Sequence, residues 1–132
     1  MYSFLLTDDH RAEIRDEFDQ RVLNSLDEKI EKKEKQFELV KRKEQLTNCF
    51  WGCIGDGGRN FPYMKLTDAD TSYRVYFCLI DSVEQLVFLK MMRKRGNQHR
   101  HDMAKKFLQQ IKRNPEQVVD HAKDIVLEEN AY

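Results

Sequence analysis

The sequence predicts an α+β fold in which an N-terminal strand and a helical hairpin pack on a small antiparallel sheet, followed by C-terminal helices. Three observations lead to this prediction. Residues 9–47 contain no glycine or proline and repeat apolar side chains at helical intervals. Residues 61–89 hold short apolar runs separated by polar turns, which is the pattern of strands. Helical spacing returns in residues 97–128. Because helices and strands occupy separate parts of the chain, we expect the helices to pack on one face of the sheet.

The N-terminal part begins with a short apolar run, residues 2–6, which we expect to be the first strand. Thr7 then has the features of a helix cap, because its hydroxyl precedes two acidic residues in a first turn. A single helix over residues 9–47 would be about 58 Å long and would project from so small a protein. The pattern Ser25-x-x-Glu28 is a capping box, so we expect two antiparallel helices with a break just before Ser25.

Lysine is concentrated in the second of these helices, in residues 29–43. Such a run is usually a solvated helix face on which acids and bases pair four residues apart. We therefore expect ion pairs such as Glu28–Lys32 and Glu31–Lys35.

Glycines crowd the loop over residues 52–58, between the helices and the sheet. Their spacing does not match the phosphate-binding pattern GxxxxGK[ST], so a flexible turn is the favoured interpretation. A strand over residues 61–66 follows. Two further strands, residues 73–79 and 86–89, are joined by a short polar turn and form a hairpin. Both strands are almost continuously apolar, so we expect this pair at the centre of the sheet.

The chain of 132 residues is expected to form one domain, residues 1–132, with an additional acidic C-terminal helix from about 115–132. The net charge of zero hides a segregation of charge. Residues 90–113 contain nine Lys and Arg against one acid, and residues 116–132 contain five acids against one base. A basic segment beside an acidic tail suggests a polyanionic partner, with a tail able to fold back over the basic face.

The cysteines Cys49, Cys53 and Cys78 match neither a CxxC redox motif nor a zinc site, so we expect reduced thiols in a cytoplasmic protein. No apolar run approaches the roughly 20 residues needed to cross a bilayer, and no signal peptide is visible. We expect no membrane contact.

The last predicted strand leads directly into a basic segment that also carries histidine. Its cations are Lys90, Arg93, Lys94, Arg95 and Arg100, and its imidazoles are His99 and His101. Imidazole can transfer a proton near neutral pH, and arginine can bind phosphate oxygens in a bidentate manner. RNA is cleaved without a metal when its 2′-hydroxyl attacks the adjacent phosphate, which requires a base, an acid and stabilising cations. Ordinary surface histidines, and a solvent-facing Arg74 on the preceding strand, would give the same pattern.

The motif YRVYF at residues 73–77, with Lys65-Leu66 before it and the basic, histidine-bearing strand end after it, resembles the RelE/HigB superfamily of toxins from bacterial type II toxin–antitoxin modules. The similarity covers roughly residues 2–112 and is nearest to the HigB-like, phage-associated branch. It implies a RelE-like fold and a ribosome-dependent endoribonuclease, or mRNA interferase, that inhibits translation in the cytoplasm.

The same resemblance implies which residues act. The catalytic residues would be Arg74, Arg93, His99 and His101, with Lys94 as a substitute for Arg93. The RNA-binding residues would be Lys65, Lys90, Lys94, Arg95 and Arg100. No metal or other cofactor is expected. The partners would be the ribosome, its mRNA and a cognate antitoxin, expected to be a helix-turn-helix protein. The helical hairpin is longer than is usual for the family, and the acidic C-terminal helix is additional.

Two other functions stay open. Members of the same superfamily poison DNA gyrase, which would make the helical hairpin the active surface. A basic module that only coats nucleic acid is the third possibility. Among the remaining residues, Tyr73 or Phe61 would stack on a base, Trp51 is expected in the core, and His10 and His121 are expected on the surface.

Overall fold

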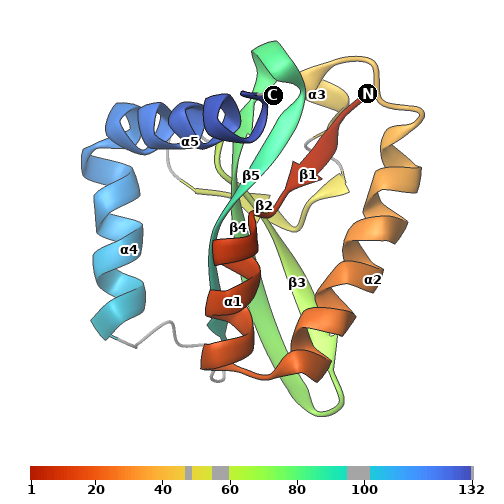
Figure 1. The fold of residues 1–132 in the computed structure, drawn as a ribbon, viewed down its shortest axis with the longest axis vertical. Coiled ribbons are helices and arrows are strands. Elements are labelled where there is room, and N and C mark those ends of the chain that lie inside the picture. The colour runs from red at the N-terminus through yellow and green to blue at the C-terminus, as the bar shows by residue number, and fades with distance from the viewer. Residues whose placement is uncertain (47–48, 55–59, 95–101, 132) are drawn as a thin grey trace.

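The computed structural model of the chain describes residues 1–46, 49–54, 60–94 and 102–131 (Figure 1). The N-terminal half contains β1 (Ser3–Leu5), α1 (Asp8–Glu17), α2 (Gln20–Phe37), α3 (Lys43–Leu46) and β2 (Gly52–Cys53). The C-terminal half contains β3 (Pro62–Asp68), β4 (Thr71–Ile80), a short 3-10 helix, η3 (Asp81–Val83), β5 (Gln85–Arg93), α4 (Asp102–Arg113) and α5 (Pro115–Glu129). The predicted α+β class is confirmed.

The five strands form a mixed sheet in the order β1-β5-β4-β3-β2. β1 runs parallel to β5, whereas the other neighbours are antiparallel. The expected purely antiparallel sheet is therefore wrong at one edge. The reason is that β1 has only three residues, which carry no signal of strand direction. The central position predicted for the β4–β5 hairpin is confirmed.

Apolar layers cover both faces of the sheet, so the expectation of helices on a single face is wrong. On one face, Val75 and Phe77 of β4 share a buried cluster with residues of α1 and α2. On the other face, Cys78 of β4 shares a second cluster with residues of α4 and α5. The reason lies in β4 itself, because every residue from position 75 to 80 is buried. A strand that is apolar on both sides needs cover on both sides.

The first helix begins where the sequence predicts. The Thr7 hydroxyl accepts the His10 backbone N–H at 3.1 Å, and His10 Nδ1 accepts the Thr7 backbone N–H at the same distance. This is a capping box in which histidine takes the place of the usual Glu or Gln.

The break between α1 and α2 lies earlier than predicted, at Phe18 and Asp19. The Asp19 carboxylate accepts the Val22 N–H at 2.8 Å and caps α2. Ser25 lies inside α2, and its hydroxyl donates to Asp68 Oδ1 at 2.9 Å in the hairpin between β3 and β4. The predicted capping box failed because its serine binds a residue that is distant in sequence.

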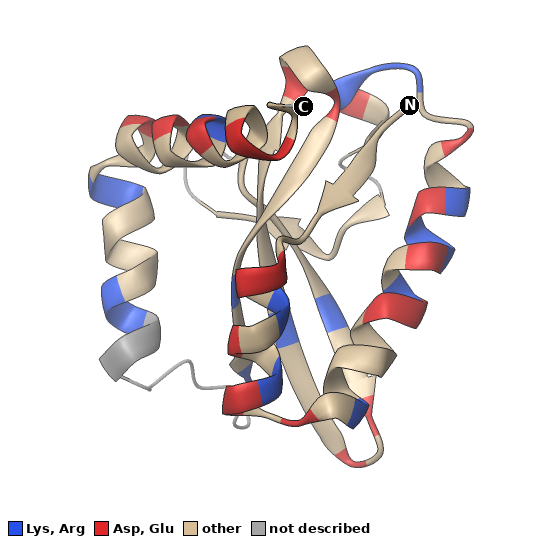
Figure 2. Cartoon of the chain, viewed as in Figure 1, with Lys and Arg blue, Asp and Glu red and all other residues tan. Residues whose placement is uncertain are grey.

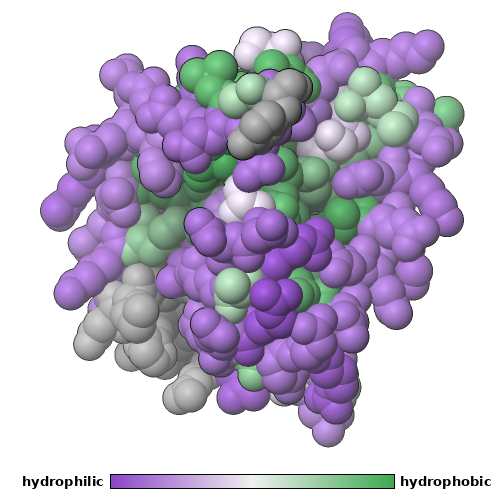
Figure 3. Space-filling view, viewed as in Figure 1, coloured by the Kyte–Doolittle hydropathy of each residue, from purple (hydrophilic) through white to green (hydrophobic). Residues whose placement is uncertain are grey.

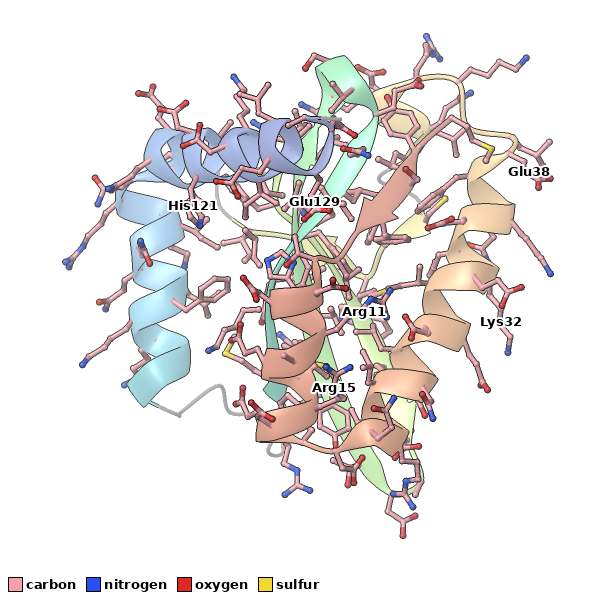
Figure 4. All side chains as sticks on the ribbon, in the orientation of Figure 1. Arg11, Arg15, Lys32, Glu38, His121 and Glu129 are labelled. Carbon is pink, nitrogen blue, oxygen red and sulfur yellow. The ribbon has the colours of Figure 1, made fainter. Side chains whose placement is uncertain are left out.

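An ion pair joins α1 to α2. The Arg11 guanidinium donates to both carboxylate oxygens of Asp27, at 2.7 and 2.9 Å, and Figure 4 shows Arg11 between the two helices. The pairs predicted along α2 itself, between residues 28 and 32 and between 31 and 35, are not among the ion pairs that described residues form within 4.0 Å. Asp27 and Arg21 of α2 instead pair with residues outside this helix.

The view in Figure 3 is mostly hydrophilic, with hydrophobic side chains visible mainly toward its centre and upper part. Among the described helices, none is long and apolar enough to cross a membrane.

Candidate nucleic-acid interface

Two cations of the predicted site lie side by side on the sheet. Lys65 of β3 is the register partner of Arg74 of β4, and Tyr63 is the partner of Tyr76 two positions away. Directly opposed residues in antiparallel strands project from the same face. Tyr63 and Tyr76 pack with the cluster beneath α4 and α5, which identifies that face. Lys65 and Arg74 therefore share the face that α4 and α5 partly cover.

Aromatic rings lie on either side of these cations. The Lys65 ammonium lies 5.7 Å from the centroid of the Trp51 ring, and the Arg74 guanidinium carbon lies 5.4 Å from the centroid of the Tyr63 ring. Tyr63 and Tyr76 follow at a centroid distance of 5.4 Å. We call Trp51, Tyr63, Lys65, Arg74 and Tyr76 the aromatic–cation row. Both cation–ring distances are within the range of cation–π attraction.

Gly52 leaves the space that the Tyr63 ring occupies. These two residues are register partners, and a Cβ atom on Gly52 would lie only 2.7 Å from the Tyr63 hydroxyl oxygen. The ring thus lies directly over the glycine, where no other residue would leave room. The Arg74 guanidinium rests on this ring, so the glycine supports the cation through the tyrosine.

Tyr76 anchors the row to the core. Its side chain is buried, and its ring contacts the ring of Phe107 in α4 at a centroid distance of 5.4 Å. Burial raises the pKa of Tyr76, and the positive charge of Arg74 partly offsets that rise. Tyr76 is therefore a neutral phenol at physiological pH.

Trp51 was expected in the core, but 65% of its surface is exposed. The proposed base-stacking residues Tyr73 and Phe61 are both buried instead. Trp51 precedes β2 and lies beside the edge of the sheet, where its backbone N–H donates to the Tyr63 carbonyl at 3.1 Å. The sequence signal was the position of Trp51 directly before Gly52, at the start of the glycine-rich loop.

The register does not bring Arg93 to the aromatic–cation row. Arg93 is the partner of Tyr73, whose ring packs on Phe18 at a centroid distance of 5.2 Å on the face covered by α1 and α2. Arg74, the neighbour of Tyr73 in sequence, projects from the other face. The register therefore assigns Arg74 and Arg93 to opposite faces of the sheet. The sequence locates a basic strand end without specifying which face each residue meets.

Two further predicted cations differ in their surroundings. The Lys90 ammonium lies 3.8 Å from a carboxylate oxygen of Glu13 in α1, so its charge is partly satisfied within the protein. Lys94 follows β5, and its backbone N–H donates to the Ser72 carbonyl at 2.8 Å. Strand alternation assigns Lys94 to the face of Arg74, which makes it a better candidate than Arg93 for the second cation.

The remaining predicted site residues, Arg95, His99, Arg100 and His101, lie outside the described residues. They belong to the segment between the end of β5 and the start of α4. Of the other two histidines, His10 packs its ring on Phe88 at a centroid distance of 5.1 Å, on the side of α1. Burial there lowers the pKa of His10. His10 is therefore half-buried, whereas His121 is exposed on α5 as expected.

The charge segregation of the sequence is also a segregation in space. Figure 2 shows Lys and Arg on α4 and on the lower part of the sheet, while α5 is mainly acidic. α5 packs Ala122 and Val126 against the cluster that contains Cys78 and Ile80 of β4. It therefore lies over the half of β4 remote from Arg74.

Redox and metal chemistry would depend on the cysteines and on clustered metal-binding side chains. Cys49, Cys53 and Cys78 are not joined by disulfides, and burial raises the pKa of Cys78 to about 12. Among the described residues, no group of three His, Cys, Asp or Glu side chains has the arrangement to hold a metal ion.

No protein-family model, curated protein or solved structure matches this chain.

Proposed function

We propose that this protein is the toxin of a type II toxin–antitoxin module, a RelE/HigB-like endoribonuclease that cleaves mRNA on the ribosome in the cytoplasm. The observation that carries the proposal is the aromatic–cation row, in which Lys65 and Arg74 are adjacent on one sheet face and each lies against an aromatic ring. Aromatic rings interleaved with cations are typical of surfaces that bind single-stranded RNA.

The order of elements supports the same proposal. A strand and a helical hairpin precede the sheet, β3 carries Lys65-Leu66, β4 carries YRVYF, and β5 ends at the basic residues. This is the arrangement that the sequence resemblance implies. The cleavage face is the one that carries Arg74, and the helical hairpin covers the opposite face.

Arg74 has the chemistry required at the scissile phosphate. A guanidinium offers two parallel N–H donors to phosphate oxygens, and its charge does not titrate in the physiological range. As negative charge builds on the phosphate during attack by the 2′-hydroxyl, Arg74 stabilises it, and Lys65 and Lys94 supply further positive charge. The proton transfers are assigned by resemblance to His99 or His101.

The test is cleavage of a reporter mRNA on purified translating ribosomes, followed by primer extension. Arg74→Ala is expected to lower the cleavage rate by roughly a hundredfold or more, which is typical for loss of a group that stabilises transition-state charge. Arg74→Lys keeps the charge but loses the two-pronged geometry, so its rate should lie between those of the parent and Arg74→Ala. Arg15→Ala, on the exposed part of α1 in Figure 4, is the matched control and should cleave like the parent. Full activity of Arg74→Ala would refute the proposal.

A second experiment tests the proton transfer. His99→Ala, His101→Ala and the double variant would be compared in the same assay over a range of pH. We expect one single variant to lose the steep dependence of rate on pH near the ordinary imidazole pKa of about 6.5. Parental rates for all three variants would remove the histidines from the mechanism.

A further inference from the structure

A groove of about 460 Å³ runs between α2 and the outer edge of β3, on a different side of Lys65 from Arg74. Its long wall is α2 and its floor is β3, with Trp51 beside Lys65. The residues that line the groove include Lys29, Lys32, Lys33, Trp51, Lys65 and Thr67. Lysines line the groove alongside the apolar side chains of Met64 and Leu66.

The groove is strongly cationic. Four lysines border it against one acid, Glu28. The ammonium of Lys33 is held by a hydrogen bond to the Cys49 carbonyl, and both burial and the charge of nearby Lys29 lower its pKa. Lys29 and Lys32 have no ion-pair partner within 4.0 Å among the described residues. Cations that crowd one another in this way are stabilised when an anion binds between them.

Trp51 gives the groove an aromatic surface. Its side chain is 65% exposed, and the Lys65 ammonium lies above its ring. An exposed indole is a stacking platform for any nucleobase, because stacking does not depend on the hydrogen-bonding edge of the base.

The edge of β3 adds backbone donors and acceptors. β2 pairs with β3 only at Pro62 and Tyr63, and Trp51 donates to the outward carbonyl of Tyr63. Because the direction of backbone groups alternates along a strand, the N–H and C=O groups of Lys65 and Thr67 also point outward, toward the groove. These groups are able to bind a ribose hydroxyl or a base edge.

We propose that the groove binds one nucleotide unit of single-stranded RNA, with its base on Trp51 and its phosphate between Lys29 and Lys32. The inference rests on the proposed function for the source of the nucleotide. Lys65 belongs to both surfaces, so one RNA strand passes from the aromatic–cation row over the edge of β3 into the groove. A free mononucleotide offers the same chemistry, and the experiment below separates the two sources.

Trp51 is the only tryptophan of the chain, so a change in tryptophan fluorescence reports on the surroundings of this one residue. The Arg74→Ala variant would be titrated with a short oligouridylate, with uridine monophosphate and with a short polyglutamate peptide. Oligouridylate is expected to quench the fluorescence and to bind at least tenfold more tightly than uridine monophosphate. Its affinity should fall steeply as the salt concentration rises. Equal affinity for uridine monophosphate would overturn the RNA assignment in favour of a free nucleotide. Equal affinity for polyglutamate would overturn it in favour of an acidic peptide.

Matched charge reversals locate the phosphate. The double variant Lys29→Glu/Lys32→Glu should lose roughly tenfold or more in affinity for oligouridylate. Lys35→Glu/Lys41→Glu makes the same change in net charge at exposed positions outside the groove, and should change the affinity less than about twofold. Equal losses in the two variants would show attraction by net charge alone and would overturn the site.

The tryptophan is tested with labelled RNA and fluorescence anisotropy. Trp51→Ala should weaken binding roughly fivefold or more, while Trp51→Phe keeps a stacking ring and should retain most of the affinity. Parental affinity of Trp51→Ala would overturn the stacking role. Binding is measured without ribosomes and without cleavage, so its failure leaves the nuclease assay unaffected. Conversely, a chain that binds RNA here but cuts no message would refute the proposed function alone.

Discussion

At the scale of single residues, Gly52 leaves the space in which the Tyr63 ring of the aromatic–cation row lies. Gly52→Ala would place a methyl group 2.7 Å from the Tyr63 hydroxyl oxygen and 2.9 Å from its ring. The ring must move, and Arg74 loses the surface on which it lies. We expect a loss of about 1–3 kcal/mol in the free energy of unfolding, as for other overpacked sites, together with weaker RNA binding.

A double-mutant cycle isolates this effect. Tyr63→Leu removes the hydroxyl and the ring, so Gly52→Ala should cost clearly less in that background than in the parent. Urea denaturation of the four proteins measures the coupling. Equal costs in both backgrounds would show that the glycine acts independently of Tyr63.

Cys78 makes stability depend on alkaline pH. Burial raises its pKa from the ordinary 9.0 to about 12. Between those values the unfolded chain loses the thiol proton and the folded chain keeps it, so stability is complete below about pH 9 and falls as the pH rises toward 12. The expected loss between about pH 9 and pH 10 is about 1 kcal/mol. Cys78→Ala and Cys78→Val carry no titrating thiol and should show a flatter dependence in urea denaturation at the same pH values. An unchanged slope in both variants would assign the dependence to other groups.

The residues that the sequence located well are those whose role is local. The Thr7 cap depends only on the next three positions, and the burial of β4 follows from its own composition. Trp51 and Arg93 were misplaced because their surroundings depend on register and on the sheet edge. Neither property is encoded within a few neighbouring residues.

At the scale of elements, the cap of α2 decides where the helical hairpin turns. Asp19→Ala removes the acceptor of the Val22 N–H and is expected to cost about 1 kcal/mol of unfolding free energy. Asp19→Asn retains a capping acceptor and should cost much less. Thermal unfolding followed by circular dichroism makes the comparison. If Asp19→Ala is as stable as the parent, the cap does not hold the break in place.

Ser25 supplies the contrasting variant, because the sequence assigned the cap to it. Ser25→Ala removes a hydrogen bond to Asp68, which Arg21 also contacts at 3.1 Å. The change affects the junction between α2 and the β3–β4 turn without affecting the start of the helix. Both Asp19 and Ser25 are good caps by residue type, so the choice between them required the tertiary contact.

The basic helix α4 is expected to contribute long-range attraction to RNA. Lys105 and Lys106 are exposed on this helix, as is Arg113 at its end. Each phosphate contact adds about one unit to the slope of log affinity against log salt. Lys105→Gln/Lys106→Gln should therefore reduce that slope by up to about two, measured by binding to ribosomes over about 50–200 mM salt. Lys123→Gln on α5 is the control, and an equal reduction there would contradict a specific role for α4.

At the scale of the whole molecule, the sheet separates two possible working surfaces. The helical hairpin covers one face, and Lys65 and Arg74 of the aromatic–cation row project from the other. The α+β class and the central hairpin were predictable, because apolar periodicity records them directly. The parallel pairing of β1 and the division of the helices between two faces were not, because both depend on long-range pairing. This separation allows the two toxin classes to be tested independently.

A ribosome-dependent nuclease stops protein synthesis first, because messages are destroyed while the ribosome holds them. A gyrase poison stops DNA synthesis first and leaves messages intact. Because Arg74 lies on the face opposite the hairpin, we expect protein synthesis to stop first. Arg74→Ala should abolish this arrest of protein synthesis. Charge reversal on the exposed hairpin surface, at Arg15 and Lys35, should leave toxicity unchanged, because both residues are exposed on α1 and α2, the helices that cover the opposite face of the sheet from Arg74. Pulse labelling of protein and DNA after induction, with primer extension on a reporter message, measures each step. Early loss of DNA synthesis with intact message, abolished by the hairpin variant and not by Arg74→Ala, would transfer the function to the helical hairpin.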